Sequence, residues 1–163
     1  MYTELIKSIL RRFYAGKNAS EDTGPVRAHD RRILGDISTG RGTILIVDDN
    51  DMVRGLARSV LESGGYTVFE ATNGRDALAI CEHSGESIDL LLTDVIMPVM
   101  GGRLLAENVE KICPNIAILF MSGFTDDGAL RNSIQKDIVN FIHKPFTPDE
   151  LELKVTEVLD ARA

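Results

Sequence analysis

The stretch TILIVDDND, residues 43–51, decides how this chain folds. Its first five residues, Thr43–Val47, are mostly apolar, as in a strand that is covered on both faces of a parallel sheet. Acidic residues follow at once. Open parallel sheets bind ligands just beyond the carboxyl ends of their strands, so this acidic run is the first place to look for a site.

The alternation of strand-like and helix-like segments continues to the end of the chain. Four more strands are predicted, at Tyr66–Glu70, Ile88–Thr93, Ile116–Met121 and Ile138–Ile142. Five helices are predicted between and after the strands, over Met52–Leu61, from Asn73 to Cys81, over Leu104–Ile112, near Asp126–Lys136, and from a capping box of Thr147 and Glu150 around Pro148. Five such β-α units predict right-handed crossovers and one open, doubly wound parallel sheet with helices on both faces.

A different segment precedes this alternation. In residues 1–14, apolar side chains from Leu5 to Phe13 recur at helical spacing, which predicts a short amphipathic helix. Residues 15–42 lack that period and have the composition of a linker, so the domain should span 43–163. The apolar stripe of the first segment favours packing on another protomer or a partner, while contact with a membrane surface and a mere linker remain open alternatives.

Composition and charge limit the classes of function. Residues 1–42 carry eight Lys/Arg and five Asp/Glu (+3) and residues 43–163 carry ten and 20 (−10), which together give the net charge of −7. An acidic body of this kind repels nucleic acid and holds divalent cations. No apolar run approaches the roughly 20 residues that span a bilayer, so a membrane span is not expected. We expect the protein to be located in the cytoplasm. Cys81 and Cys113 have no CxxC context, which argues against a zinc site and a disulfide framework.

Polar side chains follow four of the predicted strands. Asp48 and Asp49 follow the first, Asp94 the third, Ser122 the fourth and Lys144 the fifth. Carboxylates gathered at one sheet edge repel one another unless a cation lies among them, and Mg²⁺ prefers one or two carboxylates with water and phosphate oxygens. A lysine ammonium and a serine hydroxyl opposite would bind a tetrahedral dianion. The set therefore predicts phosphoryl chemistry on an aspartate.

These residues also lie in motifs of a known family. ILIVDDN at 44–50, LLLTDVIMPVMGG at 90–102, ILFMSGF at 118–124 and FIHKPFTP at 141–148 resemble the receiver domain of two-component response regulators, in the right order and spacing. The resemblance covers residues 43–160 and implies a flavodoxin-like, five-stranded sheet of order 2-1-3-4-5 with five helices, to which the N-terminal helix and linker are added. The strand order is inherited from the resemblance, because receivers are among the proteins that typify it.

The resemblance also implies roles for single residues. Asp94 would be the phosphoacceptor, with Mg²⁺ held by Asp48, Asp49, Asp94 and the backbone carbonyl of Ile96. Ser122 would bind a phosphoryl oxygen and Lys144 would pair with the phosphate. A cis peptide at Lys144-Pro145 would place the lysine.

A two-state switch is implied as well. Phe141 matches the aromatic that turns inward when Ser122 moves toward the phosphate, which changes the face formed by the fourth helix, fifth strand and fifth helix. Because Phe141 has no hydroxyl, such a switch would depend on packing alone.

Partners follow from the same resemblance. We expect a histidine kinase or histidine phosphotransfer protein as phosphodonor, a downstream protein on the switching face, and possible homodimers. Gly123 and Phe124 resemble the SGF loop of receivers attached to hybrid sensor kinases. No enzymatic activity is expected beyond self-catalysed phosphotransfer and autodephosphorylation.

Two other functions compete with this one. Asp49-x-Asp51-x-Val53 matches the DxDxV motif of haloacid dehalogenase-type phosphohydrolases. That family should have an acidic pair after the lysine at a further strand end, whereas here only Asp149 and Glu150 follow, at the start of a predicted helix. The chain could instead be an interaction module that keeps the fold and is never phosphorylated.

Overall fold

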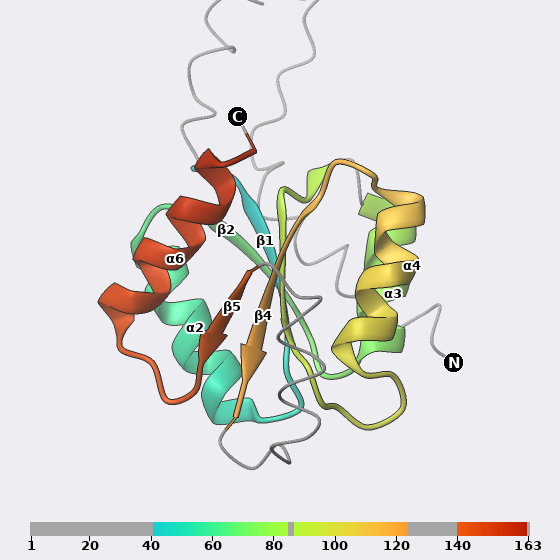
Figure 1. Ribbon diagram of the computed structural model, residues 1–163, viewed down its shortest axis with the longest axis horizontal. Helices are drawn as coiled ribbons and strands as arrows, with labels where there is room; N and C mark the ends of the chain where they lie inside the picture. Colours follow the sequence, from blue (N-terminus) through green and yellow to red (C-terminus); the bar gives the residue numbers. More distant parts are fainter. Residues whose placement is uncertain (1–40, 85–86, 124–139, 163) are drawn as a thin grey trace, which may run out of the picture. The chain divides into compact units, whose positions relative to one another are not determined.

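The computed structural model describes residues 41–84, 87–123 and 140–162, all of which belong to one compact unit, Gly40–Ala163. A parallel sheet of five strands runs through it in the order β2-β1-β3-β4-β5 (Figure 1). The strands are β1 Thr43–Val47, β2 Thr67–Ala71, β3 Leu90–Asp94, β4 Ala117–Ser122 and β5 Phe141–His143. The doubly wound sheet and its flavodoxin-like strand order are confirmed.

Helices cover both faces of the sheet. The structure describes α2 Asp51–Ser63, α3 Gly74–Ser84, α4 Gly102–Ile112 and α6 Pro148–Asp160. Helices α2 and α6 lie on one face, and α3 and α4 lie on the other (Figure 1). The helix predicted near Asp126–Lys136, the N-terminal helix and most of the predicted linker lie outside the described residues.

Alternate residues of the central strands build two cores. Ile44, Ile46 and Leu92 are fully buried with side chains of α2 and α6, among them Leu61 and Leu151. Their neighbours in the strands, Leu45, Val47 and Leu91, are buried in a second core with residues of α3 and α4. Successive side chains of a strand point to opposite faces, so a sheet that is covered twice needs unbroken apolar strands.

Local polar contacts set the helix starts. The Asn50 side chain accepts the backbone N–H groups of Met52 and Val53 at 2.9 and 3.3 Å, which caps α2. At α6 the predicted capping box is present, because Glu150 N–H donates to the Thr147 hydroxyl while the Glu150 carboxylate accepts the Thr147 N–H.

The ends of β1 match the prediction, and those of the other four strands differ from their predicted limits by one to three residues. Strand β3 begins at Leu90 and includes Asp94, whereas the apolar pattern predicts Ile88–Thr93. Strand β4 likewise includes Ser122. Backbone pairing decides these limits, since the β3–β4 register continues through Asp94 opposite Met121 although the aspartate is polar. In the described ranges no helix combines the length and the apolar character that crossing a bilayer requires.

Candidate functional site

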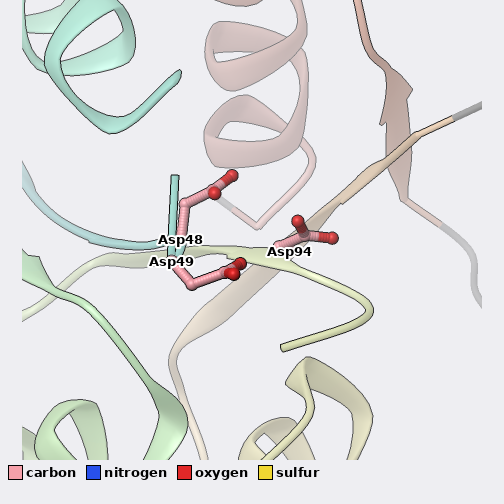
Figure 2. Close-up of side chains that lie close together, drawn as sticks. All are labelled: Asp48, Asp49 and Asp94. Carbon is pink, nitrogen blue, oxygen red and sulfur yellow. The ribbon is translucent and has the colours of Figure 1, made fainter. Parts of the chain in front are cut away.

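The carboxyl ends of β1 and β3 bring three aspartates together. The two strands are neighbours, with Val47 paired to Thr93, so Asp48 and Asp94 leave the sheet at the same level. One carboxylate oxygen from each of Asp48, Asp49 and Asp94 lies within 4.8 Å of the others. Figure 2 shows the three side chains lying close together. Asp48 is fully buried, Asp94 is half-buried and Asp49 is exposed.

Lys144 reaches the same place from the end of β5. Its ammonium nitrogen lies 2.6 Å from Oδ2 of Asp48 and 2.6 Å from Oδ2 of Asp94. The Lys144 backbone N–H donates to the Ser122 carbonyl at 2.8 Å, which continues the β4–β5 pairing beyond the last strand residue. The peptide bond between Lys144 and Pro145 is cis, as the resemblance implied. Lysine thus bridges two carboxylates that come from different strands.

The second oxygen of each bridged carboxylate accepts a hydrogen bond from a backbone N–H two residues further along the chain. Oδ1 of Asp48 accepts the backbone N–H of Asn50 at 2.8 Å. Oδ1 of Asp94 accepts the backbone N–H of Ile96 at 3.2 Å. Short loops therefore fix the two carboxylates before any ligand is added.

Burial and charge act in opposite directions on the acid–lysine group. Burial raises the pKa of Asp94, and the nearby Asp48 carboxylate raises it further, while Lys144 partly offsets both. Burial alone would lower the pKa of Lys144, but hydrogen bonds to Asp48 and Asp94 outweigh it and raise that pKa. The ammonium is thus held charged, while burial beside Asp48 makes the ionised form of Asp94 costly.

The donor set fits Mg²⁺. Oxygen ligands of an octahedral Mg²⁺ lie about 3 to 4 Å apart, close to the 4.8 Å limit that encloses the three carboxylate oxygens. Exposed Asp49 leaves the outer side open to water and to a phosphate. Ile96 lies beside the site through its N–H contact with Asp94.

A glycine allows the loop after β3 to close on itself. The Gly102 N–H donates to the Val95 carbonyl at 3.0 Å. A Cβ at Gly102 would overlap the backbone oxygen of Asp94, which no side chain tolerates. The sequence indicates only turn chemistry for Gly101-Gly102, because this contact depends on how the loop folds back.

Ser122 and Phe141, the two residues of the predicted switch, belong to the neighbouring strands β4 and β5. Ser122 is the half-buried last residue of β4. Phe141, half-buried in β5, packs against a small cluster of Val95, Ala106 and Phe120. Its ring meets that of His143 edge-on at 4.8 Å, with His143 itself exposed.

Comparison with known proteins gives the family. The family model described as the response regulator receiver domain matches residues 44–156. The chain belongs to this family. Receivers are generally non-enzymatic signalling modules that interact with histidine kinases or phosphotransfer proteins, and they typically use Mg²⁺ at an acidic pocket.

Two known proteins resemble this chain over most of its length. The sensor kinase CckA of Brucella abortus is 37% identical over 156 residues, which are 94% of this chain and 16% of that protein. The aerobic respiration control protein ArcA of Escherichia coli K12 is 33% identical over 71% of this chain and 48% of that protein. The chain thus spans less than half the length of either relative.

Solved structures agree with the fold. The receiver domain of the hybrid histidine kinase CckA is 34% identical and superimposes with a TM-score of 0.61, covering 72% of this chain and 99% of that one. A CheY-like receiver from Methanospirillum hungatei is 30% identical with a TM-score of 0.64, covering 74% of this chain and 95% of that one.

The dehalogenase alternative is not favoured. Its motif would need Asp51 to act beside Asp49, but Asp51 is the first residue of α2. The Asp51 carboxylate is exposed and pairs with Arg54 instead. The aspartate that joins Asp48 and Asp49 is Asp94 of the receiver motif.

Proposed function

We propose that this receiver accepts a phosphoryl group on Asp94 from a histidine kinase or a histidine phosphotransfer protein, and signals through protein contacts or a phosphorelay. One observation carries the proposal: Lys144 lies 2.6 Å from Asp94, at the place where the carboxylates of Asp48 and Asp49 also converge. A nucleophilic carboxylate, a fixed cation and two further acids are the parts that transfer to aspartate requires.

Each residue of the site would have a distinct role in the transfer. A carboxylate oxygen of Asp94 forms a bond to phosphorus while the bond from phosphorus to the donor nitrogen breaks, and the imidazole that leaves takes up a proton. Lys144 moves from the carboxylate to a phosphoryl oxygen, and the Ser122 hydroxyl donates to another. Asp48 and Asp49, with Asp94 and the Ile96 carbonyl, would hold Mg²⁺, which when bound supplies charge neutralisation to the phosphoryl oxygens.

Phosphorylation with a small donor tests the proposal. Incubation with Mg²⁺ and acetyl phosphate should add the mass of one phosphoryl group, as read by intact mass spectrometry. Asp94→Asn should abolish the adduct, whereas Asp160→Asn, at an exposed acid at the end of α6, should keep it. Steady turnover of a phosphomonoester would favour the hydrolase, and the absence of any adduct would favour the passive module.

We also propose that Ser122 and Phe141 change conformation together on phosphorylation. The Phe141 side chain is only half-buried and borders the cluster of Val95, Ala106 and Phe120. The downstream partner would bind a face that includes β5 and α6, where Leu153 is 63% exposed. Ring signals of selectively labelled Phe141 should shift in NMR spectra on phosphorylation. Unchanged signals in a fully phosphorylated sample would contradict the switch.

We also propose roles for the N-terminal residues and a location for the protein. Residues 1–14 would form the amphipathic helix and 15–42 the linker that precedes the domain at 43–163, and homodimers are possible. A cytoplasmic location follows from a kinase donor, which draws its phosphoryl group from ATP. The chain would catalyse only its own phosphotransfer and autodephosphorylation and would not bind nucleic acid.

A further inference from the structure

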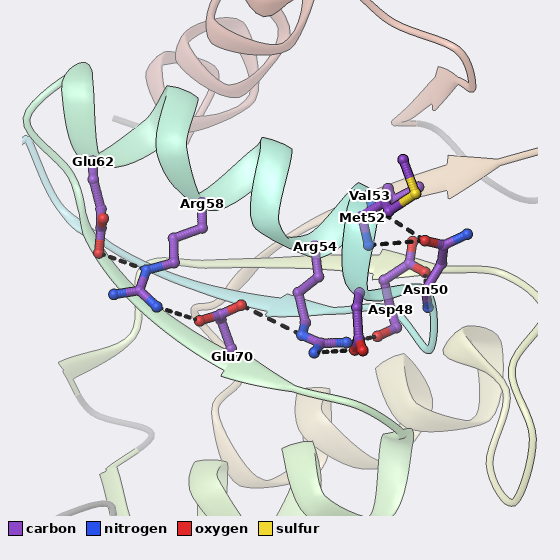
Figure 3. Close-up of polar contacts among 9 residues, drawn as sticks. Asp48, Asn50, Met52, Val53, Arg54, Arg58, Glu62 and Glu70 are labelled. Atoms are coloured by element: carbon purple, nitrogen blue, oxygen red, sulfur yellow. Dashed lines mark hydrogen bonds and ion pairs between the residues drawn. The ribbon is translucent and has the colours of Figure 1, made fainter.

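Arg54 joins three segments around the acidic site. From the first turns of α2, its Nη1 donates to the Asp48 backbone carbonyl at 2.8 Å. Its Nη2 donates to the Asp51 carboxylate at 2.5 Å, and its Nε lies 3.4 Å from Oε1 of Glu70 in β2. Figure 3 shows the guanidinium between the end of β1, the start of α2 and β2. The side chain is only 14% exposed.

The contact with Asp48 concerns its peptide group rather than its carboxylate. The Asp48 carboxylate is already held by Asn50 and Lys144, and its backbone N–H donates to the Ala71 carbonyl at 3.3 Å. The Asp48 carbonyl belongs to the peptide that links Asp48 to Asp49. Because a peptide unit is planar, a bond that fixes this carbonyl also fixes the Asp49 N–H on the opposite side.

This peptide determines where Asp49 presents its carboxylate. Asp49 is exposed and Asp48 is buried, so the chain turns outward between the two acids. A rotation of the linking peptide would move one carboxylate relative to the other. The Arg54 bond opposes that rotation from outside the cluster.

The geometry points to Arg54 as a positioning residue that holds Asp48 and Asp49 in the arrangement that binds Mg²⁺. The inference rests on the proposed function, since it concerns the metal of that site. Among the residues that the structure describes, Arg54 bonds to the Asp48 carbonyl and to the carboxylates of Asp51 and Glu70, not to the three oxygens that could hold the metal. The planar guanidinium of arginine can donate to these three partners at once, and the single ammonium of lysine cannot fully replace it.

Arg58 offers a matched control. It lies one turn further along α2 and pairs with Glu62 at 3.0 Å and with Glu70 at 2.9 Å. It therefore shares Glu70 with Arg54, and its recorded ion pairs do not include Asp48. Its side chain is 51% exposed.

The test measures Mg²⁺ affinity by calorimetry in Arg54→Met, Arg54→Lys and Arg58→Met, with folding checked by circular dichroism. Removing a hydrogen bond from a ligand's support typically weakens metal binding 10-fold or more, so Arg54→Met should raise the Mg²⁺ dissociation constant about tenfold. Arg54→Lys should fall between this variant and the unmodified chain. Arg58→Met should stay within about twofold, because it leaves the Asp48 carbonyl held.

A kinetic measurement separates positioning from general destabilisation. The rate of phosphorylation by acetyl phosphate is followed against Mg²⁺ concentration. In Arg54→Met, the half-saturating Mg²⁺ concentration should rise about tenfold while the rate at saturating Mg²⁺ stays within about twofold. A merely structural role would lower the melting temperature and leave the half-saturating concentration unchanged.

Several results would overturn the inference. Equal Mg²⁺ affinity in folded Arg54→Met and the unmodified chain would do so, as would an equal loss in Arg58→Met, since the shared Glu70 would then be the cause. If Arg54→Met does not fold, unchanged affinity in Arg54→Lys overturns it. Failure of the unmodified chain to bind Mg²⁺ or accept phosphate would overturn the proposed function as well, and the unmodified chain thereby tells the two failures apart.

Discussion

The ammonium nitrogen of Lys144 lies 2.6 Å from Oδ2 of Asp94. The two residues are 50 positions apart in the chain, and Asp48, which binds the same ammonium, is 96 positions from the lysine. The lysine side chain is 16% exposed, so solvent screens these contacts poorly. Lys144 is therefore the internal counter-ion of two carboxylates.

Loss of this counter-ion should destabilise the fold when divalent ions are removed. Lys144→Met leaves two poorly solvated carboxylates unpaired, and we expect the free energy of unfolding in EDTA to fall by about 2 kcal/mol. Urea denaturation measures it. Lys154→Met removes an exposed pair with Glu157 and should change the value by less than about 0.5 kcal/mol. Equal effects of the two variants would contradict the counter-ion role.

Neutralising Asp94 should have the opposite effect. Burial raises the pKa of Asp94 in the folded chain, so its ionised form is more costly there than in the unfolded chain. This cost is fully present above the raised pKa and disappears as the pH falls below the ordinary value near 4. Asp94→Asn should therefore raise the free energy of unfolding in EDTA at pH 7.

The same experiment at lower pH supplies the check on Asp94. The gain from Asp94→Asn should shrink as the pH falls through the raised pKa and vanish below about 4, where the carboxyl is protonated in both states. Asp160→Asn, at an exposed position, should shift the stability by less than about 0.5 kcal/mol at every pH. A gain that does not depend on pH would show that the carboxylate charge is not its cause.

Gly102 and Gly55 should respond oppositely to alanine. A Cβ at Gly102 would overlap the Asp94 backbone oxygen, so Gly102→Ala must displace the loop that carries Asp94, at a cost of about 3 kcal/mol. Gly55 lies within α2, where an added methyl group would have nothing within 4 Å, and Gly55→Ala should stabilise by about 0.5 to 1 kcal/mol. Thermal unfolding of both variants measures the contrast, and similar melting temperatures would contradict it.

The two thiols should differ in reactivity. Burial raises the pKa of Cys81 to about 12, and its side chain is 1% exposed. Cys113 is half-buried at the end of α4. With a disulfide reagent at pH 8, Cys113 should react first and Cys81 only on the timescale of unfolding, which the single variant Cys113→Ala isolates. In urea both should react at similar rates, and fast labelling of Cys81 in the folded chain would show that its burial is transient.

Much of the fold could be predicted because its signals are local. The apolar run Thr43–Val47 is β1 without any shift, and the capping box of Thr147 and Glu150 opens α6 as expected. Other limits depend on pairing with distant strands, such as the start of β3 at Leu90, which the apolar pattern places two residues early. A pattern of apolar residues carries no information about the register of a neighbour.

The sequence by itself determined that Asp48, Asp49, Asp94 and Lys144 follow strands of one parallel sheet, because the carboxyl ends of such strands share an edge. Only the tertiary structure decided which atoms meet there. The bridge of Lys144 between two acids, the approach of Gly102 to the Asp94 carbonyl and the hold of Arg54 on the Asp48 peptide depend on distances between packed segments. Those distances are set by how helices and loops pack across the sheet, and residue spacing along the chain does not encode them.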